Sequence, residues 1–290
     1  MLDSWLVFGV ALPLAVSAVV LGVALAVGRV RGLGTRAADW GVALGVGAGA
    51  AVIHLGRDWR PGFPPLDVAD RTPWLVPAAL AVGLLGPMLE RGGGAAWPRR
   101  VGLFLLATLV YVAILGPILP ATAGTRAGLG WLAVTAVLVL AAWENVAWLT
   151  VRVEGGALLG SWLAVAAGTG VVLLVSGSLT LGQLGLALAS ALVAPLLLSW
   201  RWPLGPSVRS AAPIVLAVLT ALLLNGHVYA SLPTASALLV AAAPAGAWLA
   251  RIGPARRRPW LATSLAVAGT LVPLGVAVGF ALAAQPLGDS

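Results

Sequence analysis

The stretch HLGRDWRPGFPPLDVADRTPW, residues 54–74, gathers ionisable side chains in a chain of which only 9% is charged. Several prolines restrict its backbone, so we expect a packed segment rather than a loose tether. Two interpretations stay open: an internally ion-paired cap over one end of a helical bundle, and a lid or substrate-gathering surface above a cavity. The charged residues of this stretch are Arg57, Asp58, Arg60, Asp67, Asp70 and Arg71.

The chain contains two histidines, and both are predicted at the same end of the molecule. His54 falls in the last turn of one predicted helix, and His227 lies at the end of another. A histidine near a helix C-terminus interacts favourably with the last carbonyl groups, which is the ordinary explanation for both. The alternative is a shared site in which the two imidazoles bind a metal or a haem, with Tyr229 or a loop aspartate nearby. Their spacing has no ligand signature, so no cofactor is predicted.

Glu144 and Asn145 interrupt the apolar run AAWENVAWL. An ionisable group at the bilayer centre costs about 2.5–3.5 kcal/mol, so such a residue is a functional candidate. The predicted span ends near Thr150, about 9 Å further along the helix, which places Glu144 below the inner headgroups. Structural anchoring, by snorkelling or by an ion pair with a loop arginine, is favoured over a proton-linked or substrate-binding role. Asn145 can form a hydrogen bond to a neighbouring helix.

Two further polar residues complete the candidate set. Tyr111 lies in the fourth predicted span, and Asn225 lies at the outer end of the eighth. Helix-to-helix hydrogen bonds are the ordinary role of such groups. The functional alternative is a cavity that opens outward, is lined by His54, Asn225, His227 and Tyr111, and is capped by residues 56–72.

Membrane-embedded helices must position these residues. The chain has 290 residues, 60% of them hydrophobic, and a mean hydropathy of +1.03. A soluble domain would need about 25% charged residues. We therefore predict an all-α fold, a polytopic transmembrane helical bundle that forms a single integral-membrane domain over residues 1–290. The predicted spans are approximately 5–28, 38–55, 73–89, 101–120, 128–150, 157–176, 180–200, 211–230, 234–250 and 260–284.

Local signals refine this division. Thr72 and Pro73 resemble an N-cap followed by proline at the first helical position, and Pro213 lies near another predicted helix start. In the second span, Gly41, Gly45 and Gly49 recur every four residues and give one helix face that allows close packing. The linker near residues 176–180 is short and uncharged, so it is a weak boundary. We divide 157–200 into two spans because this division keeps the later arginine clusters on the cytoplasmic side.

The distribution of arginine predicts the orientation. Cytoplasmic loops of membrane proteins are enriched in basic residues, and ten spans with an outside N-terminus place most arginines in those loops. Both termini are then outside. MLDSW has no basic region, so no removable signal peptide is expected. The predicted cytoplasmic arginines are Arg29, Arg31, Arg36, Arg91, Arg99, Arg100, Arg152, Arg201, Arg209, Arg251, Arg256, Arg257 and Arg258; the outer ones are Arg57, Arg60, Arg71 and Arg126.

Several chemistries are excluded by the sequence. The chain has no cysteine, which removes disulfides, thiolate catalysis and cysteine metal sites. It has no Walker-type phosphate loop, no HExxH motif and no GxSxG elbow. Its net charge of +8 is scattered over short loops rather than gathered in a stripe, so nucleic acid is not an expected partner.

The expected function is a permease-like small-molecule transporter with an outward-facing cavity. The alternative is a non-catalytic integral subunit or scaffold of a larger membrane complex, because an ion-coupled carrier normally needs more intramembrane carboxylates. A membrane enzyme using outer Asp and His residues is a third, less favoured interpretation. Expected partners are the lipid bilayer, anionic lipid headgroups at the cytoplasmic Arg clusters, and protein subunits. The expected location is the bacterial cytoplasmic (inner) membrane.

Overall fold

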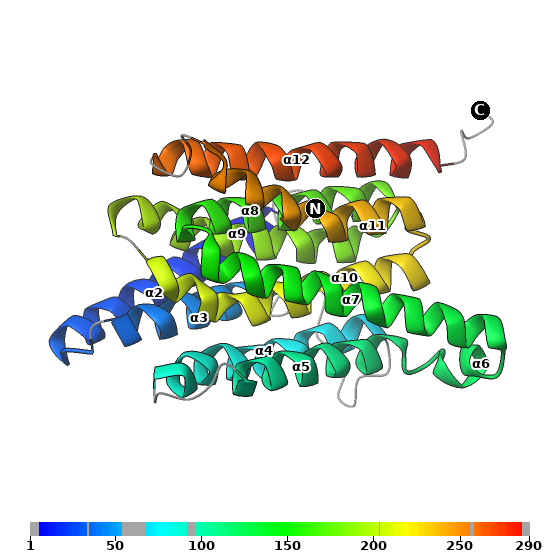
Figure 1. Cartoon of the computed structure of the whole chain (residues 1–290), viewed down its shortest axis with the longest axis horizontal. Coiled ribbons are helices and arrows are strands. Elements are labelled where there is room, and N and C mark those ends of the chain that lie inside the picture. The colour runs from blue at the N-terminus through cyan, green and yellow to red at the C-terminus, as the bar shows by residue number, and fades with distance from the viewer. Residues whose placement is uncertain are drawn as a thin grey trace.

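The computed structural model of the chain describes residues 6–33, 35–53, 68–91, 97–202, 204–253, 255 and 258–285. Within these ranges the fold is helical and contains no strand, which confirms the all-α prediction. The helices run side by side as long rods (Figure 1). In chain order they are η1 (Val7–Ala11), α2 (Leu12–Val30), α3 (Thr35–Val52), α4 (Val68–Arg91), α5 (Trp97–Leu115), α6 (Leu119–Ala123), α7 (Arg126–Arg152), α8 (Gly155–Val175), α9 (Leu179–Arg201), η3 (Gly205–Ala211), α10 (Ala212–Tyr229), α11 (Thr234–Ala242), η4 (Ala243–Arg251) and α12 (Pro259–Ala283).

Each predicted span overlaps a helical stretch of the described residues. Among the described residues, six stretches are long and apolar enough to cross a membrane, as the prediction of a membrane protein requires. Two shorter apolar helices cover Trp74–Gly86 and Arg100–Leu115. The membrane-length stretches are Val7–Val30, Arg126–Arg152, Gly155–Val175, Leu179–Arg201, Ser207–Tyr229 and Pro259–Ala283.

Helix α3 is an inner helix. It packs against α2, α4, α9 and η3, and most of its residues are buried. Protein rather than lipid surrounds it, so its sequence can be rich in glycine and carry Asp39 without being strongly apolar. The glycine face predicted from the sequence makes these contacts. A Cβ added at Gly45 would lie 3.0 Å from the Ser17 carbonyl oxygen of α2, and one at Gly49 would lie 2.7 Å from the Ala191 Cβ of α9.

The turn between α8 and α9 confirms that residues 157–200 form two helices. The α8 helix ends at Val175, and the Ser176 and Ser178 amides return to the carbonyls of Val172 and Leu173. Gly177 has a φ of +91°, which glycine adopts without the steric cost that a Cβ would add. A short uncharged linker is therefore sufficient to reverse the chain.

Helix α4 begins earlier than the sequence predicts. Its first residue is Val68, so residues 68–72 are helical and the predicted 56–72 loop is wrong for this part. Thr72 and Pro73 are consequently not an N-cap and a first helical residue. The guanidinium of Arg71 donates a 2.8 Å hydrogen bond from Nη1 to the carbonyl of Ala113 near the end of α5, and this contact fixes the additional turn.

Helix α5 ends earlier than predicted. Its last residue is Leu115, five positions before the predicted end of the fourth span at residue 120. Gly116 and Pro117 follow, and the ring of a proline disfavours helical geometry in the residue before it. The chain turns there and starts the short helix α6. The ninth predicted span is also divided, since α-helical geometry ends at Ala242 and 3₁₀ geometry continues to Arg251.

Replacing Arg71 tests its contact with α5. We expect Arg71→Met to lower the free energy of unfolding by about 1.5–3 kcal/mol, because a hydrogen bond from a charged donor to a partly buried carbonyl is lost. Equilibrium denaturation in mixed micelles measures this. Arg126→Met is the matched control, since Arg126 is exposed at the start of α7. Equal stability of the two variants would contradict a structural role for the Arg71 bond.

Candidate functional site

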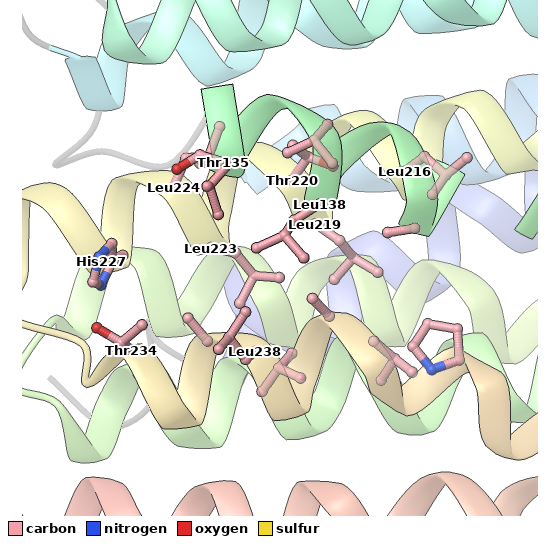
Figure 2. Close-up of a pocket in the computed structure, with 18 of the residues that line it drawn as sticks. Thr135, Leu138, Leu216, Leu219, Thr220, Leu223, Leu224, His227, Thr234 and Leu238 are labelled. Carbon is pink, nitrogen blue, oxygen red and sulfur yellow. The ribbon is translucent and has the colours of Figure 1, made fainter. Parts of the chain in front are cut away.

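A groove lies between α7, α10 and α11, which we call the α7–α10–α11 groove (Figure 2). It encloses a cavity of about 260 Å³. Its lining residues are Trp131, Val134, Thr135, Leu138, Val139, Ala142, Val146, Val165, Leu216, Leu219, Thr220, Leu223, Leu224, His227, Thr234, Ala237, Leu238, Val240, Ala241 and Pro244.

The floor and the rims of the groove differ in exposure. Helix α10 supplies floor residues such as Leu216 and Leu219, which are 6% and 7% exposed. The rims carry Val134 and Leu138 on α7, which are 59% and 45% exposed, and Leu238 on α11, which is 45% exposed. Exposed apolar side chains on both rims indicate that the groove opens sideways, toward hydrocarbon in a membrane-embedded protein.

The polar groups of the groove gather at the His227 end. The Nδ1 of His227 lies 3.0 Å from the carbonyl oxygen of Leu232, which can only accept, so Nδ1 is the donor. The ring also stacks on Trp131, with 6.4 Å between ring centroids and 25° between planes. These two contacts fix the imidazole and leave Nε2 as its remaining hydrogen-bonding atom. Thr234 lines the same end, at the start of α11 (Figure 2).

Deeper in the groove the polar atoms are already paired. Thr220 accepts a 2.9 Å hydrogen bond from the indole Nε1 of Trp143. Thr135 donates to the Trp131 carbonyl of its own helix at 2.8 Å. Apart from His227, the described lining residues include no ionisable side chain. The groove therefore suits a molecule with an apolar body and a hydrogen-bonding group at one end.

The structure brings only part of the predicted site together. His227 lines the groove, whereas Asn225 and Tyr111 are not among its lining residues. Asn225 is two residues from His227, which is about 200° around a helix, so it lies on the other side of α10. Its side chain is 3% exposed, and Nδ2 has no hydrogen-bond partner among the described residues. Tyr111 donates a 2.7 Å hydrogen bond to the Leu132 carbonyl and joins α5 to α7.

The charged segment is only partly described. The side chain of Arg71 is the described member of this group, and it binds the α5 carbonyl named above. Asp70 belongs to helix α4, but its side chain lies outside the described set. Both interpretations of the segment, as a cap and as a lid, stay predictions. The residues that lie outside the described ranges are His54, Arg57, Asp58, Arg60 and Asp67.

The metal or haem site at His54 and His227 stays the alternative that it is in the sequence, because His54 lies outside the described residues. Across the described ranges, no group of three or more His, Asp or Glu side chains is placed to hold a metal ion. Of the two ring nitrogens of His227, only Nε2 is left to bind a metal, because Nδ1 donates to the Leu232 carbonyl.

Glu144 and Asn145 have different environments. Asn145 accepts a 2.9 Å hydrogen bond at Oδ1 from the Trp248 indole, which confirms the predicted bond between helices and joins α7 to η4. Glu144 is exposed and lines a small cavity of about 60 Å³ together with Arg100 at the start of α5. The anchoring role of Glu144 near the inner headgroups stays a prediction.

Sequence reasoning overlooked two residues. Asp39 of α3 is a buried carboxylate, with 2% of its surface exposed. Its backbone carbonyl accepts a 2.7 Å hydrogen bond from Ser210 of η3. The signal available in the sequence was the position of Asp39, an acidic residue inside the predicted 38–55 span. The stacking of Trp131 on His227 had no signal in the sequence, because α7 and α10 are far apart along the chain.

Comparison of the chain with protein-family models, with curated proteins and with solved structures finds no match.

Proposed function

We propose that this membrane protein is a permease-like carrier for a lipid-soluble small molecule, which it binds in the α7–α10–α11 groove. One observation carries the proposal: the groove is lined by apolar side chains and has one fixed imidazole, that of His227, at its polar end. A strongly charged solute would find no counter-charge among the described lining residues. A molecule with a hydrocarbon body and a hydroxyl, carbonyl or carboxyl group fits this arrangement.

We infer further that the chain crosses the bacterial cytoplasmic membrane ten times with both termini outside. Successive helices reverse direction, and the C-terminal ends of α2 and α7 and the N-terminal ends of α3, α8 and α12 lie toward the left of the bundle in Figure 1. The connections at 116–118 and 230–233 lie at the right end (Figure 1). The positive-inside rule favours the arginine-rich left end as cytoplasmic. The His227 end of the groove then faces outward.

A photoreactive probe tests binding. We expect a palmitic acid analogue with a diazirine in its acyl chain to label peptides of α7, α10 and α11 in nanodiscs, as mapped by mass spectrometry. Ala237→Trp places an indole in the groove and is expected to reduce this labelling about tenfold. Leu271→Trp is the matched control, because Leu271 is an exposed apolar residue of α12. Equal labelling of the wild-type protein and of Ala237→Trp would overturn the groove as a binding site.

A second measurement separates a carrier from a passive binder. In proteoliposomes with a fluorescent single-chain lipid, a membrane-impermeant reductant bleaches the outer leaflet. A carrier makes the remaining fluorescence decay faster, and Ala237→Trp should abolish the acceleration. Groove labelling without such transfer would refute the carrier function.

The alternative, an integral subunit of a larger complex, has its own support. The exposed rims at Val134, Leu138 and Leu238 form an apolar face on which a transmembrane helix of a partner could pack. Co-purification of a stoichiometric partner that is lost in Ala237→Trp, but not in Leu271→Trp, would favour this function over transport.

A further inference from the structure

A second groove lies between α2 and α9, on helices that do not line the first one. It encloses about 440 Å³ and is lined by Leu14, Ala18, Leu21, Gly22, Leu25, Ala26, Arg29, Ala194, Leu197, Leu198 and Trp202. We call it the α2–α9 groove. Apart from Arg29 and the indole of Trp202, the described lining is aliphatic.

Small residues of α2 create this groove. Ala18, Gly22 and Ala26 follow one another at intervals of four residues, so they share a helix face, and all three are exposed. A Cβ added at Gly22 would meet no described atom within 4 Å. Leucines of both helices form the sides. From Leu14 to Arg29 the groove follows α2 for about 22 Å, more than the roughly 15 Å of hydrocarbon in one leaflet.

The groove ends at a cation. The guanidinium of Arg29 lies over the Trp202 indole, 5.0 Å from the ring centroid. This cation–π contact holds the charge at the mouth of the groove and leaves the edge of the guanidinium, with its N–H donors, available. Arg29 is exposed, and no acidic side chain appears in the described lining.

Two more arginines belong to the same end of the helix pair. Helices α2 and α9 run in parallel, since Ser17 donates to the Ala191 carbonyl at 2.7 Å and Arg29 lies on Trp202 further along both helices. Arg31 therefore ends α2 where Arg201 ends α9, and both are exposed. The α2–α9 groove is therefore apolar, as long as an acyl chain, and flanked at one end by three arginines.

We infer that the α2–α9 groove binds an anionic phospholipid, with one acyl chain between the two helices and the phosphate on Arg29. The guanidinium edge matches two phosphate oxygens geometrically. The aliphatic lining matches the chain, and the empty volume over Gly22 accommodates it. This inference requires only that the chain is embedded in a bilayer and does not rest on the carrier function proposed above.

Native mass spectrometry of the intact protein tests the inference. Phosphatidylglycerol and phosphatidylcholine with identical acyl chains are titrated onto the delipidated protein. We expect the first phosphatidylglycerol to bind about fivefold more tightly than phosphatidylcholine, as for one charge at the membrane surface. Arg29→Gln is expected to remove that preference. Arg126→Gln, an exposed arginine at the start of α7, should keep it.

Filling the groove tests the place of the acyl chain. Gly22→Phe should weaken the first binding event of both lipids, because the ring occupies the acyl position. Gly275→Phe is the matched control, since a Cβ at exposed Gly275 on α12 also meets no described atom within 4 Å. Ala26→Phe provides a second groove-filling variant if Gly22→Phe does not fold.

The outcomes separate the alternatives. Loss of preference in Arg29→Gln together with weaker binding in Gly22→Phe supports the site. Unchanged phosphatidylglycerol binding in both groove-filling variants would mean that the arginines attract headgroups without a groove, and it would overturn the inference. Equal affinity of the wild-type protein for the two lipids would do the same. Neither result depends on the photolabelling of the α7–α10–α11 groove.

Discussion

Gly49→Leu is expected to lower the free energy of unfolding by about 3 kcal/mol, because the position has no room for a side chain. A Cβ at Gly49 would lie 2.7 Å from the Ala191 Cβ, 2.8 Å from the Pro13 carbonyl oxygen and 3.2 Å from the Ser17 Cβ. All three are backbone atoms or the first atom of a side chain, so they cannot rotate away. The substitution must separate α3 from α2 and α9.

The matched control for this substitution is Gly275→Leu, in which the added atoms meet open space. Reversible denaturation of the purified protein in mixed micelles, followed by circular dichroism, measures both variants. We expect Gly275→Leu to remain within about 0.5 kcal/mol of the wild type, as is usual for surface substitutions. Equal destabilisation by the two leucines would show that the glycine face of α3 is not tightly packed.

Trp162→Ala is expected to cost about 3–5 kcal/mol of stability, the second large effect. Trp162 lies in α8, is 1% exposed and belongs to the largest buried side chains. Its removal leaves a cavity that the surrounding helices cannot fill completely. The measurement is the same denaturation experiment.

Trp162→Phe separates packing from hydrogen bonding. The indole Nε1 of Trp162 is buried and has no hydrogen-bond partner within the described part of the protein. Phenylalanine retains most of the ring and removes this unpaired donor, so we expect a far smaller loss than for alanine. If Trp162→Phe destabilises the protein as much as Trp162→Ala does, the Nε1 atom has a polar partner that the described residues do not supply.

Apolar runs were sufficient to predict the helices but not all of their ends. The run length set by bilayer thickness located α8, α9 and α12 within two residues. The start of α4 was placed too late because Asp70, Arg71 and Thr72 interrupt the apolar pattern. In the structure, Arg71 of this turn binds the Ala113 carbonyl of α5. Such a contact is tertiary, and no local pattern reports it.

The grooves were beyond prediction for the same reason. His227 was selected as a candidate from its residue type and its position at a helix end. That it lines a groove depends on α7 and α11 flanking α10, which follows from packing between helices far apart in the sequence. The hydrogen bond between Asn145 and Trp248 was predicted in part: a bond from Asn145 to a neighbouring helix was expected, but its partner Trp248 was not.

The burial of α3 has a consequence for synthesis of the protein. This helix carries Arg36 and Asp39 and is rich in glycine, so on its own it partitions poorly into lipid. Its cover includes α9 and η3, which leave the ribosome more than a hundred residues later. Early in translation α3 must therefore be held by the insertion machinery or by α2 alone, and it becomes stably buried only once α9 and η3 have arrived.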